Sequence, residues 1–293
     1  GDVRARLKKA NVDIGIVGAG IAGLACAYEL KRLGVAATVH EASSRVGGRM
    51  FSMGGQNGGS IDWQGQVIER GGELIDTPHK TMQGYARELG LQLEDITKPA
   101  RDTFYYFDGL RIPEATMVEQ YRVLASAMQD DLRLSSAGPT ADAFTPYDQM
   151  LDAMSLAQYL DSRGAPPLVK KLLTVAYTIE YGIEADKMSC LAFLLFAKAS
   201  KQSKLRLWGN FSDERYHVIG GNEQIPAGLA ARLPGQINLG RRLVAVRKTP
   251  AGRVELTMKE GSKTIVVTHD VEETRRRDGD PHGGSHRPGE VPT

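Results

Sequence analysis

The first residues whose types and spacing suggest chemistry are three glycines near the N-terminus. Gly18, Gly20 and Gly23 form the order GxGxxG between an apolar run and a stretch with helical spacing. In that setting the first glycine permits a tight turn, the second lets a diphosphate approach the backbone, and the third lets helix and strand pack closely. The N–H groups and the positive end of the helix would then meet the phosphates. The spacing therefore predicts a dinucleotide-binding turn.

An acidic residue and two arginines follow this turn. Glu41 ends the second predicted strand, where a carboxylate can accept hydrogen bonds from both ribose hydroxyls. Its charge disfavours a 2′-phosphate and therefore argues against NADP. Arg45 and Arg49 flank Gly47 and Gly48, which places bare backbone and cations where the diphosphate would lie. We interpret the combination as favouring FAD over NAD; the alternative is a glycine-rich turn followed by a surface glutamate.

Local patterns indicate the elements that would position these residues. Residues 12–17 and 37–40 fit buried strands around a helix over 21–33, which is a βαβ unit with a parallel sheet. The Asp108-Gly109 pair predicts a hairpin turn. Further helices are expected at 82–89, 115–132, from 155 onward, 168–181, 189–199 and 225–231. Further strands are expected at 217–219, 243–247, 254–258 and 264–268, the last three as a meander.

Composition excludes several classes of protein. The chain has 293 residues, of which 41% are hydrophobic and 25% charged, with a net charge of +2. These values are ordinary for a globular protein and argue against membrane-spanning segments and against nucleic acid as a partner. Cys26 and Cys190 suit neither a disulfide framework nor a zinc cluster, so no metal site is expected, and Cys26 is interpreted as core. No signal peptide is visible, so we expect a cytoplasmic protein.

Four segments of the chain fit one pattern. They are VGAGIAGLACAYEL from Val17, HEASSRVGGRM from His40, ERGGELID from Glu69 and ERYHVIGGNEQIPAGLA from Glu214. Together they resemble the flavin-dependent amine oxidases, a family that includes monoamine, polyamine and L-amino-acid oxidases. The first two segments are also shared with phytoene desaturases and protoporphyrinogen oxidases, whereas the last two favour the amine oxidase branch, and its bacterial amino-acid oxidase-like members most.

The resemblance implies a set of residues that contact FAD. Gly71 and Gly72 would lie near the ribityl chain and the flavin ring, where side chains would clash. The strand from residue 243 resembles one whose backbone contacts adenine, and we place that contact at Leu243 or Val244; ordinary strand core is the alternative. The expected cofactor contacts are Gly18, Ala19, Gly20, Gly23, Glu41, Ala42, Arg49, Gly71, Gly72, Glu73, Leu243 and Val244.

The order of elements predicts the fold class. We expect an α/β protein with a Rossmann-like FAD-binding domain, whose parallel sheet and β-meander are interrupted by a helix-rich substrate-domain segment. The FAD-binding domain would use residues 1–76 and 211–269, and the helix-rich segment would use 77–210. Residues 270–293 carry many arginines, glycines and prolines with few aliphatic side chains, so we expect a disordered tail.

The substrate side gives weaker signals. Tyr105 lies in a predicted strand and could line a pocket, although aromatic residues there also serve as strand core. Glu180 and Tyr181 end a predicted helix, where Glu180 could meet a cationic amine or be an ordinary exposed glutamate. In L-amino-acid oxidases an arginine beside the motif at Gly71 binds the substrate carboxylate. The corresponding stretch here, which begins at Glu73, contains no arginine. Amine and amino acid therefore both stay open as substrates, and no catalytic residue is assigned.

Two functions follow from the resemblance. The first is an FAD-dependent oxidoreductase that oxidises the carbon–nitrogen bond of an amine or L-amino acid to an imine and reduces molecular oxygen to hydrogen peroxide. The second is a truncated, non-catalytic flavin-binding remnant, because family members continue well beyond the meander and this chain changes character after Thr268. We expect a C-terminally truncated member whose tail comes from another reading frame or an early end of the gene. The sequence indicates no oligomeric state.

Overall fold

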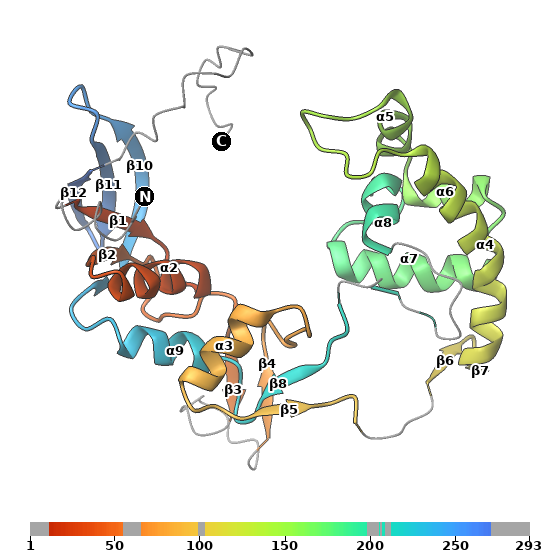
Figure 1. Ribbon diagram of the computed structural model, residues 1–293, viewed down its shortest axis with the longest axis horizontal. Helices are drawn as coiled ribbons and strands as arrows, with labels where there is room; N and C mark the ends of the chain where they lie inside the picture. The colour runs from red at the N-terminus through yellow and green to blue at the C-terminus, as the bar shows by residue number, and fades with distance from the viewer. Residues whose placement is uncertain are drawn as a thin grey trace. The chain divides into compact units, whose positions relative to one another are not determined.

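The structure is a computed structural model that describes residues 12–54, 66–98, 103–197, 205, 207–208 and 212–270. The chain divides into two compact units, one formed by Gly1–Gly71 with Gly220–Thr293 and the other by Gly72–Ile219. Figure 1 shows the elements of each unit along the chain. The tail expected at 270–293 lies outside the described residues except for Asp270.

The first unit is built on a three-stranded parallel sheet with the order β1-β2-β9. Its strands are β1 (Ile14–Val17), β2 (Ala37–His40) and β9 (Ile237–Asn238). Helix α2 (Ile21–Arg32) joins β1 to β2, so the predicted βαβ unit is confirmed. The helix buries Leu24, Ala27 and Tyr28. It ends before Gly34, whose φ of +83° is a left-handed conformation that favours glycine.

One expectation about this helix is wrong. Cys26 is exposed, whereas the sequence interpretation placed it in the core. The buried side of α2 is set by Leu24, Ala27 and Tyr28, and a residue two positions from Leu24 points about 200° away around the helix. Cys190, in contrast, is buried.

An antiparallel meander completes the core of the first unit. It consists of β10 (Arg241–Lys248), β11 (Val254–Glu260) and β12 (Lys263–His269), as the alternating pattern predicted. Leu256 and Met258 on the central strand are buried. β10 and β12 also contact β2 and β1 respectively, and Figure 1 shows the meander beside the parallel strands. The meander therefore supports the sheet that carries the glycine-rich turn.

A short antiparallel pair and one helix adjoin this core. The pair is β3 (Ser52–Gly54) with β4 (Val67–Glu69), and the helix is α9 (Gln224–Ala231), which packs on α2. Ser52 and Glu223 bond reciprocally: Ser52 N–H donates to Glu223 Oε2 (2.9 Å) and Glu223 N–H donates to Ser52 Oγ (3.0 Å). Glu69 accepts from the hydroxyl of Ser52 (2.7 Å) and the N–H of Asn222 (2.8 Å). These bonds join residues far apart in the sequence.

The second unit combines short strand pairs with helices. β5 (Leu93–Asp95) pairs with β8 (Tyr216–Val218), and β6 (Phe104–Phe107) forms a hairpin with β7 (Leu110–Pro113). The hairpin turn has positive φ at both Asp108 (53°) and Gly109 (80°), as a tight two-residue turn requires. Its helices are α3 (Lys80–Glu88), α4 (Glu114–Leu134), α5 (Pro146–Ala153), α6 (Leu156–Ser162), α7 (Pro167–Tyr181) and α8 (Cys190–Ala197).

The helices α4 to α8 enclose an apolar core, and a buried carboxylate on α4 links three of them. Asp131 on α4 is buried and accepts hydrogen bonds from the hydroxyls of Tyr147 and Tyr159, each at 2.6 Å. It also forms a two-pronged ion pair with Arg163, with N–O distances of 2.9 and 3.0 Å. A buried carboxylate is tolerated only when its lone pairs are occupied in this way. Asp131 thus joins α4, α5 and the end of α6.

Candidate functional site

Backbone hydrogen bonds hold the glycine-rich turn after β1 in place. Gly18 has a φ of +98°, and its N–H donates to the carbonyl of His40 at the end of β2 (2.7 Å). The carbonyl of Ala19 accepts from the N–H of Gly47 (2.8 Å), which ties the second glycine-rich segment to the first. Two stretches that the sequence separately assigned to one diphosphate are therefore adjacent in the first unit.

The three glycines of the turn have different reasons to be glycine. Gly18 needs its left-handed φ, and a Cβ at Gly23 would overlap the carbonyl oxygen of Gly18. Gly20 has neither constraint, since its φ of −72° and ψ of 176° suit any residue. A Cβ at Gly20 would find Gly48 Cα as its nearest neighbour, at 4.0 Å. The fold leaves room at Gly20 that a ligand can use.

The helix that follows offers its N-terminus to an anion. Gly20 is the N-cap of α2 and provides no side-chain cap, and no acidic residue lies in the first turn. The first N–H groups of a helix have no partner within the helix, and the helix dipole favours negative charge there. A diphosphate next to Gly20 would therefore meet both hydrogen-bond donors and a favourable potential.

Glu41 sits beside the turn as an ionised acceptor. Its Oε2 accepts from the N–H of Ala19 and its Oε1 from the N–H of Ser43, each at 2.7 Å. Burial acts to raise the pKa of Glu41, but the hydrogen bonds from Ser43 and Ala19 outweigh it and the pKa is lowered. Each carboxylate oxygen can accept a further bond. Glu41 can thus receive two hydroxyl groups, and Ala42 next to it is exposed.

The structure separates the roles of the two arginines. Arg45 donates to the carbonyls of Val46 (3.0 Å) and Gly48 (2.6 Å), and its guanidinium lies 4.2 Å from the ring centre of Phe51. Arg45 therefore shapes its own loop. Arg49 is exposed and takes no part in these contacts. The contact of Arg49 with the cofactor, which the resemblance implies, stays a prediction.

The remaining expected cofactor contacts fall into both units. A Cβ at Gly71 would overlap the backbone oxygen of Arg49, so a close approach of two backbone segments requires this glycine. Gly72 and Glu73 are exposed and belong to the second unit. Their contacts with a flavin stay a prediction.

The strand expected to meet adenine begins close to Glu41. Arg241 N–H donates to the carbonyl of Glu41 (2.7 Å), and Gly240 N–H donates to that of Ser43 (3.0 Å). The pairing of β10 with β11 shifts between Leu243 and Ala245, so a β-bulge leaves Val244 without a partner residue on β11. A bulge frees backbone groups from the ladder. The adenine contact stays a prediction, and Val244 is the better of its two positions.

The second unit contains the expected substrate residues. Tyr105 lines a cavity of about 560 Å³ together with Thr97, Thr103, Glu114, Leu205, Leu207, Trp208, Ser212, Asp213 and Glu214. Glu214 has a φ of +46°, which is unusual for a residue other than glycine. Burial raises the pKa of Glu214, and the carboxylates of Asp76 and Glu180 raise it further. Glu214 is the strongest signal at this cavity, and sequence reasoning missed it.

Two expected substrate residues lie outside that cavity lining. Glu180 is exposed on α7, although its charge acts on Glu214. Tyr181 stacks on Tyr177 with ring centres 5.9 Å apart and meets Phe196 edge-on. Tyr181 therefore belongs to an aromatic cluster at the end of α7, and its contact with a substrate stays a prediction.

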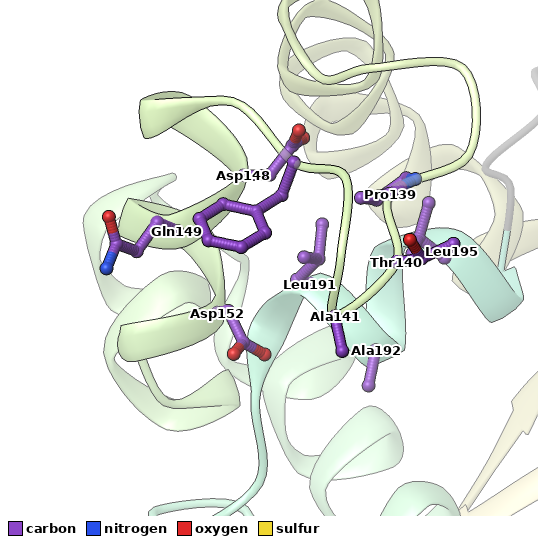
Figure 2. A pocket seen from close by; sticks show the side chains of 10 residues that line it. Pro139, Thr140, Ala141, Asp148, Gln149, Asp152, Leu191, Ala192 and Leu195 are labelled. Carbon is purple, nitrogen blue, oxygen red and sulfur yellow. The ribbon is translucent and has the colours of Figure 1, made fainter. Parts of the chain in front are cut away.

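A second cavity of about 530 Å³ lies among α5, α8 and the loop before α5 (Figure 2). Its lining is largely apolar and includes Phe144, Leu191 and Leu195. The lining carboxylate of Asp148 is already engaged, because Ser135, Ser136 and Thr145 all donate to it. Asp152 accepts from Ser189. Thr140, Gln149 and Asp152 are the other polar residues of its lining.

No described helix is long and apolar enough to cross a membrane. No group of three or more histidine, cysteine, aspartate or glutamate side chains within the described ranges is arranged to hold a metal ion.

Comparison with known proteins defines the class. The family pattern described as flavin containing amine oxidoreductase matches residues 21–275. The chain belongs to this family of flavoprotein oxidoreductases, and its mixed α/β fold with a parallel sheet is the one expected. The resemblance seen in the four sequence segments is confirmed.

Individual relatives place the chain within that family. An L-amino-acid oxidase of Naja atra is 25% identical over 276 residues, which cover 86% of this chain and 49% of that protein. A Mycobacterium tuberculosis protein assigned by name as a flavin-containing monoamine oxidase, AofH, is 27% identical over 259 residues, covering 85% and 54%. Wild-type putrescine oxidase bound to putrescine aligns with a TM-score of 0.68 at 24% identity, covering 88% and 56%. The chain thus spans about half the length of these relatives.

Proposed function

We propose that this chain binds FAD through its first unit and serves the oxidation of the carbon–nitrogen bond of an amine, with molecular oxygen reduced to hydrogen peroxide. The observation that carries the proposal is the open space at Gly20, at the uncapped N-terminus of α2. A glycine that the fold does not require, next to donors without partners in their helix, suits the approach of a diphosphate.

The residues of the first unit fit the parts of FAD one by one. Gly18, Ala19 and Gly20 would hold the diphosphate against the start of α2, with Arg49 as a cation nearby. Glu41 would accept the ribose hydroxyls, because it is ionised and each oxygen has capacity beyond its backbone bond. The backbone of Val244 would meet the adenine. These contacts recognise the adenosine diphosphate half of the cofactor.

Bound flavin would supply the acceptor for a hydride from the carbon that bears the amine, and oxygen would then take up the electrons. The amine nitrogen loses a proton, and water hydrolyses the resulting imine. The chain's own residues bind and orient the cofactor and bring an amine into the second unit. Burial and the carboxylates of Asp76 and Glu180 raise the pKa of Glu214, and a cationic amine beside it would favour its charged form.

The cavity of the second unit favours an amine over an amino acid. Glu114, Asp213 and Glu214 line it together with the aromatic rings of Tyr105 and Trp208. Carboxylates and aromatic faces both attract an ammonium group. The carboxylate of an amino acid would be repelled by the same groups. We therefore propose a cationic amine without an adjacent carboxylate as the substrate class.

The experiment separates cofactor binding from turnover. The purified chain is titrated with FAD, and binding is followed by flavin fluorescence and the visible spectrum. Peroxide release is then measured at saturating FAD with putrescine, benzylamine and L-leucine. Faster turnover of the amines than of L-leucine is the expected result. FAD binding without peroxide would leave a flavin-binding function and refute the oxidase proposal for this chain, and absence of FAD binding would refute the proposal at its first step.

A charge variant tests the substrate class. Glu214→Gln should raise the KM for putrescine about fivefold, since it removes one partly exposed charge near the ammonium group. Glu119→Gln is the matched control, because Glu119 lies on the exposed side of α4 and pairs only with a surface arginine. Equal KM values for the two variants would remove Glu214 from the substrate site.

A further inference from the structure

Two buried histidines face each other behind the glycine-rich turn. His40 ends β2 and His269 ends β12, and their Nε2 atoms lie 3.2 Å apart. The two residues are only 1% and 7% exposed. Nδ1 of His269 lies 3.1 Å from Oδ1 of Asp13, which precedes β1. Asp13, His269 and His40 thus form a chain across three segments of the first unit, which we name the histidine chain.

The first unit is shaped to hold this chain. A Cβ at Gly15 on β1 would overlap the imidazole ring of His269, so Gly15 provides the space that the ring occupies. The backbone also binds on either side of it: Asp270 N–H donates to the carbonyl of Asp13 (2.8 Å), and Asp13 N–H donates to Asp270 Oδ2 (3.1 Å). The end of β12 is therefore held against the start of β1, with His269 pointing inward.

The geometry determines where the protons are. A contact of 3.2 Å between two ring nitrogens needs one donor and one acceptor. The carboxylate of Asp13 accepts from His269 Nδ1, so a neutral His269 offers the lone pair of its Nε2. His40 then donates through Nε2, and its Nδ1 carries no proton. That Nδ1 is buried without a hydrogen-bond partner among the described residues, which costs less for a lone pair than for an N–H group.

A further proton has no favourable place in the histidine chain. Added to either ring, it leaves an N–H group at Nδ1 of His40, where the described residues provide no acceptor. The closed arrangement therefore belongs to two neutral rings. Protonation would favour an open arrangement in which His40 reaches water.

Charged groups surround the histidine chain on several elements. Arg241 on β10 faces His40 and pairs with Glu260 (3.1 Å). Arg253, just before β11, pairs with Asp270 (2.7 Å) and lies 3.6 Å from Asp13. Asp13 is the carboxylate of the histidine chain, and it lies next to both Arg253 and His269.

The pKa of His40 is lowered as a result. Burial is the largest cause, and His269 and Arg241 add to it. Asp13 opposes these effects but does not outweigh them. The closed histidine chain therefore persists somewhat below the pH at which an ordinary histidine takes up its proton, near 6.5.

The histidine chain is coupled to the dinucleotide turn through the backbone of His40. The carbonyl of His40 accepts the N–H of Gly18 (2.7 Å), the first glycine of the turn. The next residue is Glu41, whose carboxylate accepts a hydrogen bond from the N–H of Ala19. A change in the position of His40 therefore displaces both the turn and the carboxylate that would receive the ribose.

We propose that Asp13, His269 and His40 are positioning residues for the cofactor, which hold the turn and Glu41 in the binding geometry only while both imidazoles are neutral. FAD binding by this chain is therefore weakened by mild acidification. The inference rests on the proposed binding of FAD in the first unit.

The dissociation constant of FAD, measured from pH 8.0 to 5.5, tests the inference. FAD is the probe because its diphosphate is esterified at both ends, whereas a terminal phosphate such as that of ADP titrates near pH 6. Below the lowered pKa of His40, one proton must leave the imidazole before the histidine chain can form. The dissociation constant of FAD therefore rises by a factor that approaches ten per pH unit. We expect no rise down to about pH 6.5 and a progressive rise at lower pH.

A pair of variants assigns the effect to the histidine chain. His40→Gln retains an amide that can donate to His269 or, after rotation, accept from it, and it carries no titrating group. The rise in the dissociation constant should fall to less than about twofold in this variant, whatever its affinity at pH 8.0. His79→Gln is the matched control, since His79 is an exposed histidine of the second unit, and it should retain the full rise.

A readout without flavin separates this inference from the proposed function. Ring-nitrogen NMR of the protein without flavin should show His40 with a proton on Nε2 and none on Nδ1 at pH 7.5. His40 should take up its second proton at a lower pH than an ordinary histidine, which does so near 6.5. His79 serves as the exposed reference in the same spectrum. Titration of His40 at an ordinary histidine pKa, or an equal pH dependence of FAD binding in His40→Gln, would overturn the inference. Failure to bind FAD at any pH would refute the proposed function. The NMR result would still decide the protonation of His40 in the histidine chain.

Discussion

A valine at position 20 provides the sharpest test of the cofactor site. Gly20 occupies an extended conformation, with φ of −72° and ψ of 176°, that valine adopts without strain. Among the described residues, apart from its two chain neighbours, the nearest atom to the new Cβ would be Gly48 Cα at 4.0 Å. Gly20→Val should therefore fold normally while its side chain fills the space in front of the first turn of α2.

Opposing effects on folding nearly cancel. Valine is a poorer N-cap than glycine by about 1 kcal/mol. Replacing glycine by a residue that tolerates its backbone angles stabilises by roughly 0.4–1 kcal/mol, because the unfolded chain becomes less flexible. The net change should lie within about 1 kcal/mol, which corresponds to a shift in Tm of no more than about 4 °C for a chain of this size.

The effect on binding is much larger. At least one hydrogen bond from a backbone N–H to a charged phosphate oxygen is lost, worth about 1.5–3 kcal/mol. The dissociation constant of FAD should therefore rise at least about tenfold. Gly20→Ala should give a smaller increase in the same direction, because its side chain is shorter.

The assay combines a fluorescence titration with FAD and thermal unfolding by circular dichroism. Variant and wild type should unfold at nearly the same temperature and differ in FAD affinity. A variant that binds FAD as tightly as the wild type would refute the assignment of the open space at Gly20 to the diphosphate. A variant with strongly reduced Tm would show instead that the fold itself requires this glycine.

Three further changes test other parts of the structure. Glu41→Gln keeps the shape and loses the charge, so FAD affinity in a titration should fall about tenfold, and Glu41→Ala should weaken it more. Gly23→Ala should lower the Tm and abolish FAD binding. Gly84→Ala is the control, because a Cβ at Gly84 meets no described atom within 4 Å. It should raise the stability of α3 by about 0.5 kcal/mol in denaturant unfolding. Asp131→Asn should destabilise the helical unit by about 3 kcal/mol in the same measurement, because it leaves a cation without its partner, while the exposed Asp161→Asn should change stability by less than about 1 kcal/mol.

Local signals predicted much of the fold. The hairpin at Asp108-Gly109 was predictable because two adjacent residues with positive φ favour this pair. Ser155 caps α6 through a reciprocal bond with Gln158, as the spacing indicated. The strands of the meander alternate with a period of two because only one of their faces meets the core. Such features depend on residues a few positions apart, which the sequence displays directly.

Other elements escaped the sequence analysis although similar signals existed. Helix α5 begins with a capping box of Thr145 and Asp148 and a proline at its first position. That pattern could have been found with the rule that located α6. The pairing of β5 with β8 is different, because Leu93 and its partner Val218 lie far apart in the sequence and each strand is only three residues long. No local pattern specifies such a partner.

The candidate site shows the same division. GxGxxG, the acid at Glu41 and the glycines flanked by arginines could be recognised in the sequence because dinucleotide-binding turns use those residue types in that order. The sequence did not show that Arg45 uses its guanidinium within its own loop. Arg45 donates to the carbonyls of Val46 and Gly48, and these contacts form only when the loop is folded. The unusual backbone and raised pKa of Glu214 likewise arise from neighbours that the chain order separates.

Periodicity and turn geometry are expressed over short spans, so local patterns predicted the βαβ unit and the meander, and the glycine spacing led to the proposal of a dinucleotide ligand. The difference between Gly20 and Gly23 is visible only in the folded protein: a Cβ at Gly23 would overlap the carbonyl oxygen of Gly18, whereas the fold leaves room at Gly20, where we propose that a diphosphate binds. The tertiary structure also brought His40 and His269 together across 229 positions. Contacts of that kind depend on the packing of several elements at once, and no single stretch of sequence contains them.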